Sequence, residues 1–542
     1  MSDFSKNSLS RRCFVRGSLG TAIAMASAGI LAGCSSDSGD TSSTEEAKVL
    51  RFGCSNPKVT FDTQKTSNDV GVSEAVAESL VALDPDTKEI YPVLLTELPT
   101  VSDDGLVYTF ELKDGVKFHN GETLKASDVK YTFTRMFLPE TEATSIDSYM
   151  YIEGAQEIID GTSTELTGIE VTDDTHFTIT LTQPYSTFLA MLAQFYAVIY
   201  PESACSEAGS EWGTGTSFIG TGPFTLESND DSTEVVLKAF DDYHEGRPEL
   251  DEVDFDYIDD ANTRMLSYKN DDIDLAFIDR SIISTYAEDE DVKDDIVYYT
   301  PGSCQFVNLN LTSDNLKDVR VREALSLAIN REELCSTVLN GCGDPCTSFL
   351  PPSCTGHDDS LEVLEYDPDR AKELLEEAGV SDLTLDFQIR SQDQNVAVAL
   401  QNYWSQIGVT ANVTVIDNGM WSDSRRDGGL EITTVTWSTL SFQGVEHMGS
   451  YFRSDRASAK SSFYDSETFD GLIDAARQTV NDDDQVIVLT KQADNQLVRT
   501  DWACIPIDWP QMPYALKPKF SGLKVLVNPH FGDVTVNEDS ES

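Results

Sequence analysis

The sequence predicts a mixed α/β protein with several domains. Its 542 residues correspond to about three domains if one domain holds ~150 residues. Helix and strand patterns alternate from residue 367 to residue 416, which favours helices packed in layers on a sheet. Between Asp104 and Phe137 a strand, tight turns and a helix follow one another, and the other predicted elements can be placed in order around this stretch.

The stretch from Asp104 to Phe137 reads DGLVYTFELKDGVKFHNGETLKASDVKYTFTRMF. Its first strand has one apolar face, formed by Leu106, Tyr108, Phe110 and Leu112. The dipeptides Asp114-Gly115 and Asn120-Gly121 predict turns on either side of a short second strand. We expect Ser127 or Asp128 to cap the helix that follows, whose buried side consists of Val129, Phe133, Met136 and Phe137.

Further elements are expected along the rest of the chain. Residues 168–181 predict a second hairpin, with its turn at Asp173-Asp174. Helix starts are indicated by Asp318, by Asn330 with Glu333, and by Asp367 before Pro368. The other expected strands are 49–52, 251–258, 270–278, 409–416 and 432–437, and the other expected helices are 74–83, 184–200 and 396–407.

The first 34 residues predict an export signal rather than a part of the fold. Arg11 and Arg12 lie in a motif that resembles the twin-arginine export motif. An apolar run from Leu19 to Leu31 follows, and it is shorter than the ~20 apolar residues that span a bilayer. We therefore expect this segment to direct export without forming a transmembrane helix.

The export signal ends in a predicted lipid attachment site. Leu31-Ala32-Gly33-Cys34 resembles a bacterial lipobox, in which the Cys34 thiol takes the lipid. Two or more acyl chains, at ~0.8 kcal/mol for each buried CH₂, would hold the protein stably on a membrane. The polar residues 35–47 would then form a flexible tether.

The charge balance argues against direct binding to anionic partners. The chain has 38 Lys and Arg against 94 Asp and Glu, which gives a formal charge of −56. Such a protein is soluble and repels nucleic acids and anionic membrane surfaces. The acidic residues are spread along the whole chain, so we interpret them as a solvated surface rather than as a site for cationic ligands.

The sequence contains no recognisable catalytic constellation, cofactor motif or metal site. His244-Glu245 is followed by Gly-Arg-Pro, so no second histidine completes an HExxH zinc motif. The glycines between Gly213 and Gly222 do not form GxGxxG, and neither a GK[ST] loop nor a G-x-S-x-G elbow is present. The six histidines are isolated. We therefore expect a protein that is not an enzyme and that has no cofactor and no metal.

Cysteine usage predicts disulfide bonds. Apart from Cys13 in the export signal and the lipid site Cys34, eight cysteines remain, and an even set is typical of exported proteins with bridges. Four of them are clustered, namely Cys335, Cys342, Cys346 and Cys354. Only the spacing of Cys342 and Cys346 fits a zinc knuckle. Two bridges within the cluster, of open connectivity, are therefore favoured over a zinc site and over buried free thiols.

Several pieces of the sequence match one known pattern. The stretch from Asp104 contains DG, a strand, GVKFH, a glycine, a spacer of small residues, DV and an aromatic pair. Thr221-Gly222-Pro223-Phe224 and the segment from Lys317 to Leu334 match two further parts. With these pieces in order over nearly the whole mature chain, the sequence resembles the family 5 extracellular solute-binding proteins, which bind peptides, nickel and related solutes for ABC importers.

The resemblance implies a two-lobed, periplasmic-binding-protein-like α/β fold with a hinge. An extra domain is inserted in the first lobe, and the ligand lies between the lobes. On this interpretation residues 1–34 are the export signal and 35–47 the tether. The first lobe is formed by 48–83, 201–299 and 520–542 with the C-terminal tail, the inserted domain by 84–200, and the second lobe by 300–519.

The resemblance also implies a function. We expect a lipid-anchored monomer, exported to face the periplasm or the cell exterior, that captures a peptide and delivers it to ABC permease subunits. A metal chelate or another non-peptide organic solute is the alternative ligand, and a ligand sensor is an alternative role. A secreted hydrolase is a third interpretation, against which the lack of a nucleophile–base motif argues.

Ligand contacts implied by the resemblance centre on Thr436 and Trp437. In oligopeptide-binding relatives a Trp precedes by three residues an Asp that pairs with the amino terminus of the peptide. Trp437 matches that Trp, but the residue three positions on is Leu440. A buried ammonium would lack a carboxylate there, so we expect a peptide whose amino end is blocked or held elsewhere, or a non-peptide molecule. The alternative is that Trp437 is only a core aromatic residue.

A hinge disulfide is also implied by the resemblance. Cys304 begins the strand QFVNLN, which the family uses on entering the second lobe, and Cys504 begins IPIDW, near where the chain returns. Both residues would lie close to the crossing strands. We therefore expect a Cys304–Cys504 bridge.

Overall fold

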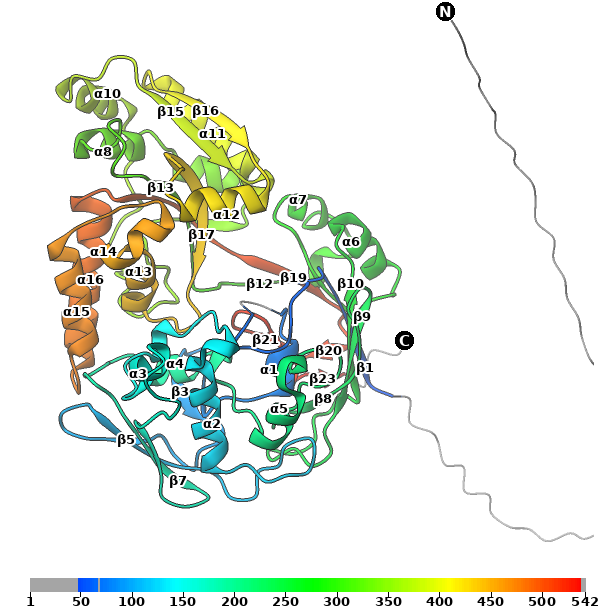
Figure 1. The fold of residues 1–542 in the computed structure, drawn as a ribbon. Helices are drawn as coiled ribbons and strands as arrows, with labels where there is room; N and C mark the ends of the chain where they lie inside the picture. Colours follow the sequence, from blue (N-terminus) through cyan, green and yellow to red (C-terminus); the bar gives the residue numbers. More distant parts are fainter. Residues whose placement is uncertain (1–46, 67–68, 538–542) are drawn as a thin grey trace, which may run out of the picture. The chain divides into compact units, whose positions relative to one another are not determined.

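The computed structural model describes residues 47–66 and 69–537 (Figure 1). The predicted export signal, with Arg11, Arg12 and Cys34, lies outside these residues, as does the tether up to residue 46. Within the described part of the chain, no helix has both the length and the apolar content that a membrane crossing requires.

A seven-stranded sheet forms the first lobe. Strand β1 (Val49–Cys54) lies inside it and pairs in parallel with β10 (Glu252–Tyr257) and β11 (Leu275–Phe277). The strand order is β12-β19-β11-β1-β10-β9-β8. The remaining strands are β8 (Phe224–Asp230), β9 (Glu234–Ala239), β12 (Ile296–Tyr299) and β19 (Met512–Leu516), and the helices are α1 (Val72–Val76), α5 (Glu202–Ala208), α6 (Ala261–Lys269) and α7 (Ile283–Tyr286).

A six-stranded sheet forms the second lobe, in the order β14-β18-β13-β17-β15-β16. Every residue of its inner strands β13 (Ser303–Leu309) and β18 (Cys504–Pro510) is buried, because helices cover both faces of the sheet. The other strands are β14 (Gly343–Pro345), β15 (Thr384–Ile389), β16 (Thr410–Val415) and β17 (Ile432–Ser438).

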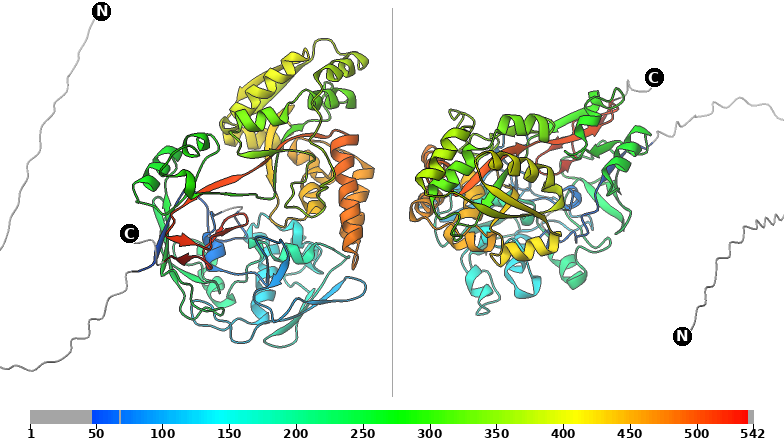
Figure 2. Two further views of the ribbon diagram at one scale, coloured as in Figure 1. Left: turned by 180° about the vertical axis from the view of Figure 1, so that it is seen from behind. Right: turned by 90° about the horizontal axis from the view of Figure 1, so that it is seen from above.

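The helices of the second lobe fall into two groups, one on each face of its sheet (Figures 1 and 2). One face packs against α8 (Val319–Leu327), α10 (Pro368–Glu377) and α11 (Gln394–Gln406), and the other against α13 (Gly444–Phe452), α15 (Glu467–Gln478) and α16 (Asp483–Asn495). The second lobe also contains α9 (Arg331–Glu333), α12 (Asn418–Arg426) and α14 (Ser454–Ala457). The predicted caps are confirmed, since Asp318, Asn330 and Asp367 each accept a hydrogen bond from a backbone N–H of the first turn.

The chain crosses between the two sheets twice, which forms the hinge. It leaves β12 of the first lobe for β13 of the second through residues 300–302, and it returns from β18 to β19 through Gln511. The sequence places the end of the second lobe at residue 519. The chain re-enters the first lobe earlier than that, because β19 pairs with β11 and β12 of the first sheet. We retain the other predicted domain boundaries as a proposal.

The inserted domain has its own sheet and its own core. Its strands are β4 (Thr100–Val101), β5 (Val107–Glu111), β7 (His176–Thr180) and β6 (Ile169–Val171), in that order across the sheet. Three helices pack with it, α2 (Ala126–Phe137), α3 (Ala155–Ile159) and α4 (Phe188–Leu192). The pairs β2 (Val81–Leu83) with β3 (Ile90–Pro92), β20 (Phe520–Ser521) with β23 (Thr535–Val536), and β21 (Lys524–Val525) with β22 (Pro529–His530) form small separate ladders.

The predicted strand and helix from Asp104 to Phe137 are confirmed in their packing but not in the helix cap. Tyr108, Phe110 and Leu112 are buried, as is the predicted apolar side of α2. The helix begins earlier than expected, with Lys125 as its cap. The Asp128 carboxylate instead accepts a hydrogen bond from the Lys125 backbone N–H at 2.9 Å, which satisfies one of the free donors at the helix start.

Two of the predicted helices are wrong in length. The segment 74–83 contains the end of α1 and then strand β2, and the segment 184–200 contains only α4 and a 3₁₀ turn at Phe195–Ala197. Their backbone groups pair with distant segments instead: the Ile199 N–H donates to the Glu78 carbonyl, and the Val93 N–H donates to the Leu80 carbonyl. Tertiary pairing therefore overrides the local helical pattern.

The structure contradicts the predicted disulfides. All eight cysteines of the described residues are free, buried thiols. Cys304 and Cys504 lie in the same apolar core, but the nearest sulfur to Cys304 Sγ is that of Cys346, at 3.9 Å, about twice the length of an S–S bond. Cys335, Cys342 and Cys354 are likewise unpaired, and burial raises the pKa of the Cys342 thiol to about 11. These cysteines fill apolar space, as small hydrophobic residues do.

Candidate functional site

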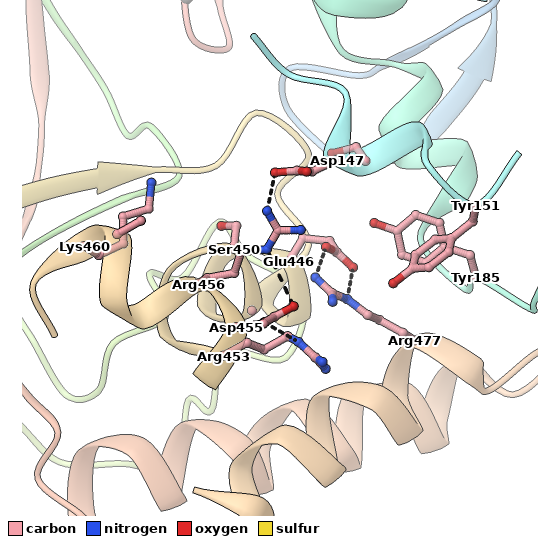
Figure 3. Close-up of a pocket in the computed structure, with 13 residues that line it drawn as sticks. Asp147, Tyr151, Tyr185, Glu446, Ser450, Arg453, Asp455, Arg456, Lys460 and Arg477 are labelled. Atoms are coloured by element: carbon pink, nitrogen blue, oxygen red, sulfur yellow. Dashed lines mark hydrogen bonds and ion pairs between the residues drawn. The ribbon is translucent and has the colours of Figure 1, made fainter. Parts of the chain in front are cut away.

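A cavity of about 240 Å³ lies between the inserted domain and the second lobe (Figure 3). The inserted domain provides one wall, with Asp147, Ser148, Tyr151 and Tyr185. The second lobe provides the other wall, with Glu446, Gly449, Ser450, Arg453, Asp455, Arg456, Ala459, Lys460 and Arg477. A molecule in this cavity would therefore touch both parts of the fold at once.

An ion pair between helices α13 and α15 supports one side of the cavity. The Arg477 guanidinium donates to both carboxylate oxygens of Glu446, at 3.0 and 2.7 Å, and the two side chains are only 12% and 10% exposed. Burial acts to lower the pKa of Arg477, but the Glu446 carboxylate outweighs it and the pKa lies above its ordinary value. The Thr187 hydroxyl of the inserted domain donates to Glu446 at 2.9 Å, which joins this pair to the opposite wall.

Two further arginines of the cavity are also neutralised by carboxylates. Arg456 pairs with Asp147 across the cavity at 2.5 Å. Arg453 pairs with Asp455 at 3.2 Å and also contacts Asp474. In Figure 3 dashed lines mark the pairs of Arg456 with Asp147 and of Arg453 with Asp455, and Lys460 stands apart from them.

Lys460 differs from the arginines because it has no acidic partner. None of the carboxylates in 47–66 and 69–537 lies within ion-pair distance of its ammonium group, which instead lies 4.7 Å from the centre of the Trp437 ring. Burial lowers the pKa of Lys460 to about 8, and the charges of Arg425 and Arg456 act in the same direction, whereas the Asp147 carboxylate, beyond ion-pair distance, acts against them. This group therefore carries a positive charge that its surroundings disfavour.

Arg425 is a second cation that lies against the Trp437 ring. Its guanidinium carbon lies over the rings of Trp421, Trp437 and Tyr451, at 5.2, 5.8 and 5.1 Å from their centres. Its Nε and Nη2 atoms are buried and have no hydrogen-bond partner among the described residues. Arg390 also lies 4.4 Å from the centre of the Trp421 ring, and it is paired with Asp393. Several cations therefore lie against aromatic rings in this part of the second lobe.

Local structure explains how Trp437 comes to lie against Ser450 and Lys460, two residues that line the cavity. Side chains alternate along β17, so Trp437 shares a face with the buried Val435 and packs edge-on against Tyr451 of α13, with ring centres 5.0 Å apart. Its indole N–H donates to the Ser450 hydroxyl at 3.3 Å, and its carbonyl oxygen lies 3.0 Å from Nε2 of His447. Helix α13 therefore holds both the indole ring and the backbone carbonyl of Trp437 in place.

The sequence predicts ligand contacts for both Trp437 and Thr436, but in the structure the two side chains lie on opposite faces of β17. Trp437 lies beside Ser450 and Lys460 of the cavity, whereas Thr436 points to the opposite face of β17 and is exposed. Leu440 is half-buried in the loop between β17 and α13. A ligand role for Trp437 and Thr436 stays a prediction, and the geometry favours Trp437.

Sequence analysis missed the cations of this wall. Trp421 and Arg425 are four residues apart on α12, a spacing that places them on one helix face and was available as a signal. Lys460 gives no such signal, because it follows α14 in the chain and meets Trp437 only through folding. No group of three or more His, Cys, Asp or Glu side chains suited to a metal ion is found in the described ranges.

Comparison with known proteins places the chain in a family. Residues 89–459 match the bacterial extracellular solute-binding proteins, family 5 Middle. The chain belongs to this family. It is 30% identical over 446 residues to the glutathione-binding protein GsiB of Salmonella typhimurium, covering 79% of this chain and 82% of that one. It is 29% identical over 441 residues to the dipeptide-binding protein of Escherichia coli, covering 77% and 80%.

Solved structures of this family share the fold. The substrate-binding protein CtaP of Listeria monocytogenes superimposes with a TM-score of 0.78 at 22% identity, covering 91% of this chain and all of that one. The periplasmic binding protein DppA of Helicobacter pylori, solved with the peptide STSA, gives a TM-score of 0.76 at 22% identity, covering 90% and 98%. The expected two-lobed fold with an inserted domain is thus confirmed.

Proposed function

We propose that this protein is a lipid-anchored receptor that captures a peptide outside the membrane and delivers it to the permease of an ABC transporter. The observation that carries this proposal is the cavity between the inserted domain and the second lobe. A solute held there contacts both walls and stabilises their approach, and the permease would recognise that closed form.

The family members support peptide as the solute. The relatives with the similarities given above are described as dipeptide-binding and glutathione-binding proteins, and both solutes are short peptides. These relatives are binding proteins rather than enzymes, which supports the same assignment here. Tyr151 and Tyr185 offer flat apolar surfaces for a peptide backbone in the cavity, with charged groups around them, and Trp437 lies next to the cavity, against Lys460.

The first test of this function concerns Trp437, the residue predicted to contact the ligand. We expect Trp437→Ala to weaken binding of the solute that co-purifies with the protein by more than ~1 kcal/mol, because a buried aromatic contact is lost. The solute is identified by mass spectrometry and its affinity is measured by calorimetry. Tyr366, which is 42% exposed, provides a control, and Tyr366→Ala is expected to leave the affinity unchanged.

One result would contradict both the site and the argument from Leu440. That result is tight binding of peptides with a free amino end, loss of binding on their acetylation, and an unchanged affinity in the Trp437→Ala variant. The amino terminus would then be held at a site that does not involve this wall.

The second test concerns the anchor. We expect Cys34→Ala to move the protein from the membrane fraction to the soluble fraction, because no thiol remains to take the lipid. Fractionation of cells followed by immunoblotting measures the change. A matched variant, Cys54→Ala, alters a buried thiol of the folded body and is expected to stay on the membrane. Unchanged fractionation of the Cys34 variant would contradict the lipobox interpretation.

A further inference from the structure

We propose that this protein folds before it crosses the membrane, and that its translocase therefore accepts a folded chain. The body thiols carry this inference. They are the eight cysteines of the described residues, namely Cys54, Cys205, Cys304, Cys335, Cys342, Cys346, Cys354 and Cys504. The order of folding and export does not depend on which solute is bound. It requires only the extracytoplasmic location of the family to which the chain belongs.

Folding makes the body thiols unreactive. None of them is more than 4% exposed. Burial also raises the pKa of each one, to about 11 for Cys304 and Cys342, so that little of the reactive thiolate forms. The folded protein therefore keeps its thiols in an oxidising compartment, where accessible thiols form disulfides.

The unfolded chain has no such protection. Eight accessible thiols allow about 105 complete pairings. In the fold every body thiol is single, and the sulfur atoms of Cys304 and Cys346 lie 3.9 Å apart, about twice the length of an S–S bond. A chain that is oxidised before it folds is therefore locked in pairings that the native packing does not contain.

Burial of the body thiols waits for the end of the chain. Four cores hold seven of the eight thiols, and each of these cores also includes side chains from residues 503–534. The core of the first lobe, for example, includes Cys54 and Cys205 together with Tyr514 and Phe531. A chain that emerged unfolded, from the export signal onward, would keep these thiols accessible until nearly all of it had crossed.

The core of the inserted domain shows the opposite pattern. Its buried residues lie between Leu80 and Ile199, so this core can form without the C-terminal segment. None of the described residues that make up this core is a cysteine. The thiols of the other four cores thus lie in the parts of the fold that close last, where early exposure to an oxidant does the most harm.

The export segment fits early folding in two ways. Lipid attachment uses the Cys34 thiol, and a disulfide at Cys34 would block it, so burying the body thiols removes eight competitors. Arg11 and Arg12 resemble the twin-arginine motif, which directs folded proteins to their own translocase. The motif and the buried thiols are independent observations, and both place folding before export.

The first experiment exposes the purified protein to glutathione disulfide, either folded or unfolded in urea that is later diluted. Each disulfide formed within the chain joins two thiols, and two glutathione thiols take up the two electrons and two protons. We expect the folded sample to keep all eight body thiols, counted by mass spectrometry after denaturation in N-ethylmaleimide. The unfolded sample should regain at least tenfold less native protein, measured by its cooperative thermal transition, than a matched sample unfolded with a reductant.

The second experiment changes the export route in cells. Arg11→Lys combined with Arg12→Lys is expected to lower export at least tenfold and to leave a folded precursor with free body thiols inside the cell. Arg16→Lys is the matched control, since Arg16 lies in the same segment outside the pair, and it should export normally.

A third form of the protein tests export of an unfolded chain. Residues 1–30 are replaced by a lipoprotein signal of the general pathway, and the lipobox from Leu31 to Cys34 is kept. We expect at least fivefold less native protein on the membrane than for the wild type. A reductant in the growth medium should restore it, because the loss comes from oxidation of the thiols.

Any of three results would overturn the inference. They are a disulfide in the body of the exported wild-type protein, full recovery of the native fold by the chain oxidised in urea, and unchanged export of the double-lysine variant or a wild-type amount of native protein from the general-pathway form. None of these measurements involves the solute. Failure here leaves the proposed peptide function standing, and failure of that function leaves these results unaffected.

Discussion

Replacing Arg477 with methionine is expected to lower the free energy of unfolding by about 3–5 kcal/mol. The substitution leaves the Glu446 carboxylate buried without its bidentate partner, and a lone buried charge is among the most destabilising defects in a folded protein. Urea denaturation followed by fluorescence measures the change. Arg426→Met removes a side chain that is 66% exposed and is expected to change stability by less than ~0.5 kcal/mol.

A double substitution separates the charge effect from a packing effect. If the loss comes from the unpaired carboxylate, changing Glu446 to methionine as well should restore a large part of the stability, because a buried ion pair is often replaceable by apolar residues. A double variant that is less stable than Arg477→Met would contradict this account. The Glu446 substitution also removes the hydrogen bond from the Thr187 hydroxyl, which joins the inserted domain to the second lobe, whereas the bond from the Ser186 N–H to the Arg477 carbonyl at 2.7 Å involves only the backbone and remains.

The second large effect is expected at the hinge, from Arg280→Met. Arg280 follows β11 of the first lobe and pairs with Asp508 on β18 of the second lobe, whose side chain is fully buried. Burial raises the pKa of Asp508 to about 6, and Arg280 opposes that rise. Without Arg280 the buried carboxylate has no counter-charge, so we expect a loss of about 3–5 kcal/mol at pH 7.5, measured by urea denaturation.

This loss is expected to depend on pH in a defined direction. The folded pKa of Asp508, about 6, lies above the ~3.9 of an unfolded Asp, so the folded state binds the proton more tightly. The contribution of Asp508 to stability is therefore fully present below pH ~4 and is lost as the pH rises through 6. Removing Arg280 raises the folded pKa further and extends this window upward.

The difference in stability between wild type and Arg280→Met should thus be smaller at pH 5 than at pH 7.5, by up to about 2 kcal/mol. Adding Asp508→Asn to the variant removes the titrating group and should abolish the pH dependence of that difference. A difference that stays constant from pH 5 to pH 7.5 would show that Asp508 is not the responsible group.

The sequence predicted elements wherever a local pattern and the tertiary contacts agree. Strand β5 and helix α2 have the expected buried faces, because alternation and the helical repeat place Phe110 and Phe133 toward one core. The helix starts at Asp318, Asn330 and Asp367 were predictable because a cap acts within a few residues. Prediction failed at 74–83 and 184–200, where Glu78 and Leu80 offer their carbonyl groups to distant backbone N–H groups.

The candidate site was predictable only in part, because local patterns can be identified in the sequence whereas contacts between distant segments cannot. A ligand role for Trp437 was predicted because its neighbourhood resembles that of known relatives, and it stays a prediction. Arg425 could be linked to Trp421 by helical spacing. The partner of each charged group could not be predicted, since Asp147 meets Arg456 and Thr187 meets Glu446 across hundreds of residues. The cysteines were misinterpreted because an even number says nothing about which sulfur atoms approach one another.

The sequence by itself therefore determined the family, the two-lobed fold and the positions of several strands and helix caps, because these depend on periodicity and on motifs that lie within single segments. Tertiary structure alone decided which cations are paired and which are not. Lys460 and Arg456 lie four residues apart, yet only Arg456 meets a carboxylate, on the inserted domain. An ion pair forms only where folding brings opposite charges within about 4 Å, and that distance is set by how the inserted domain packs against the second lobe.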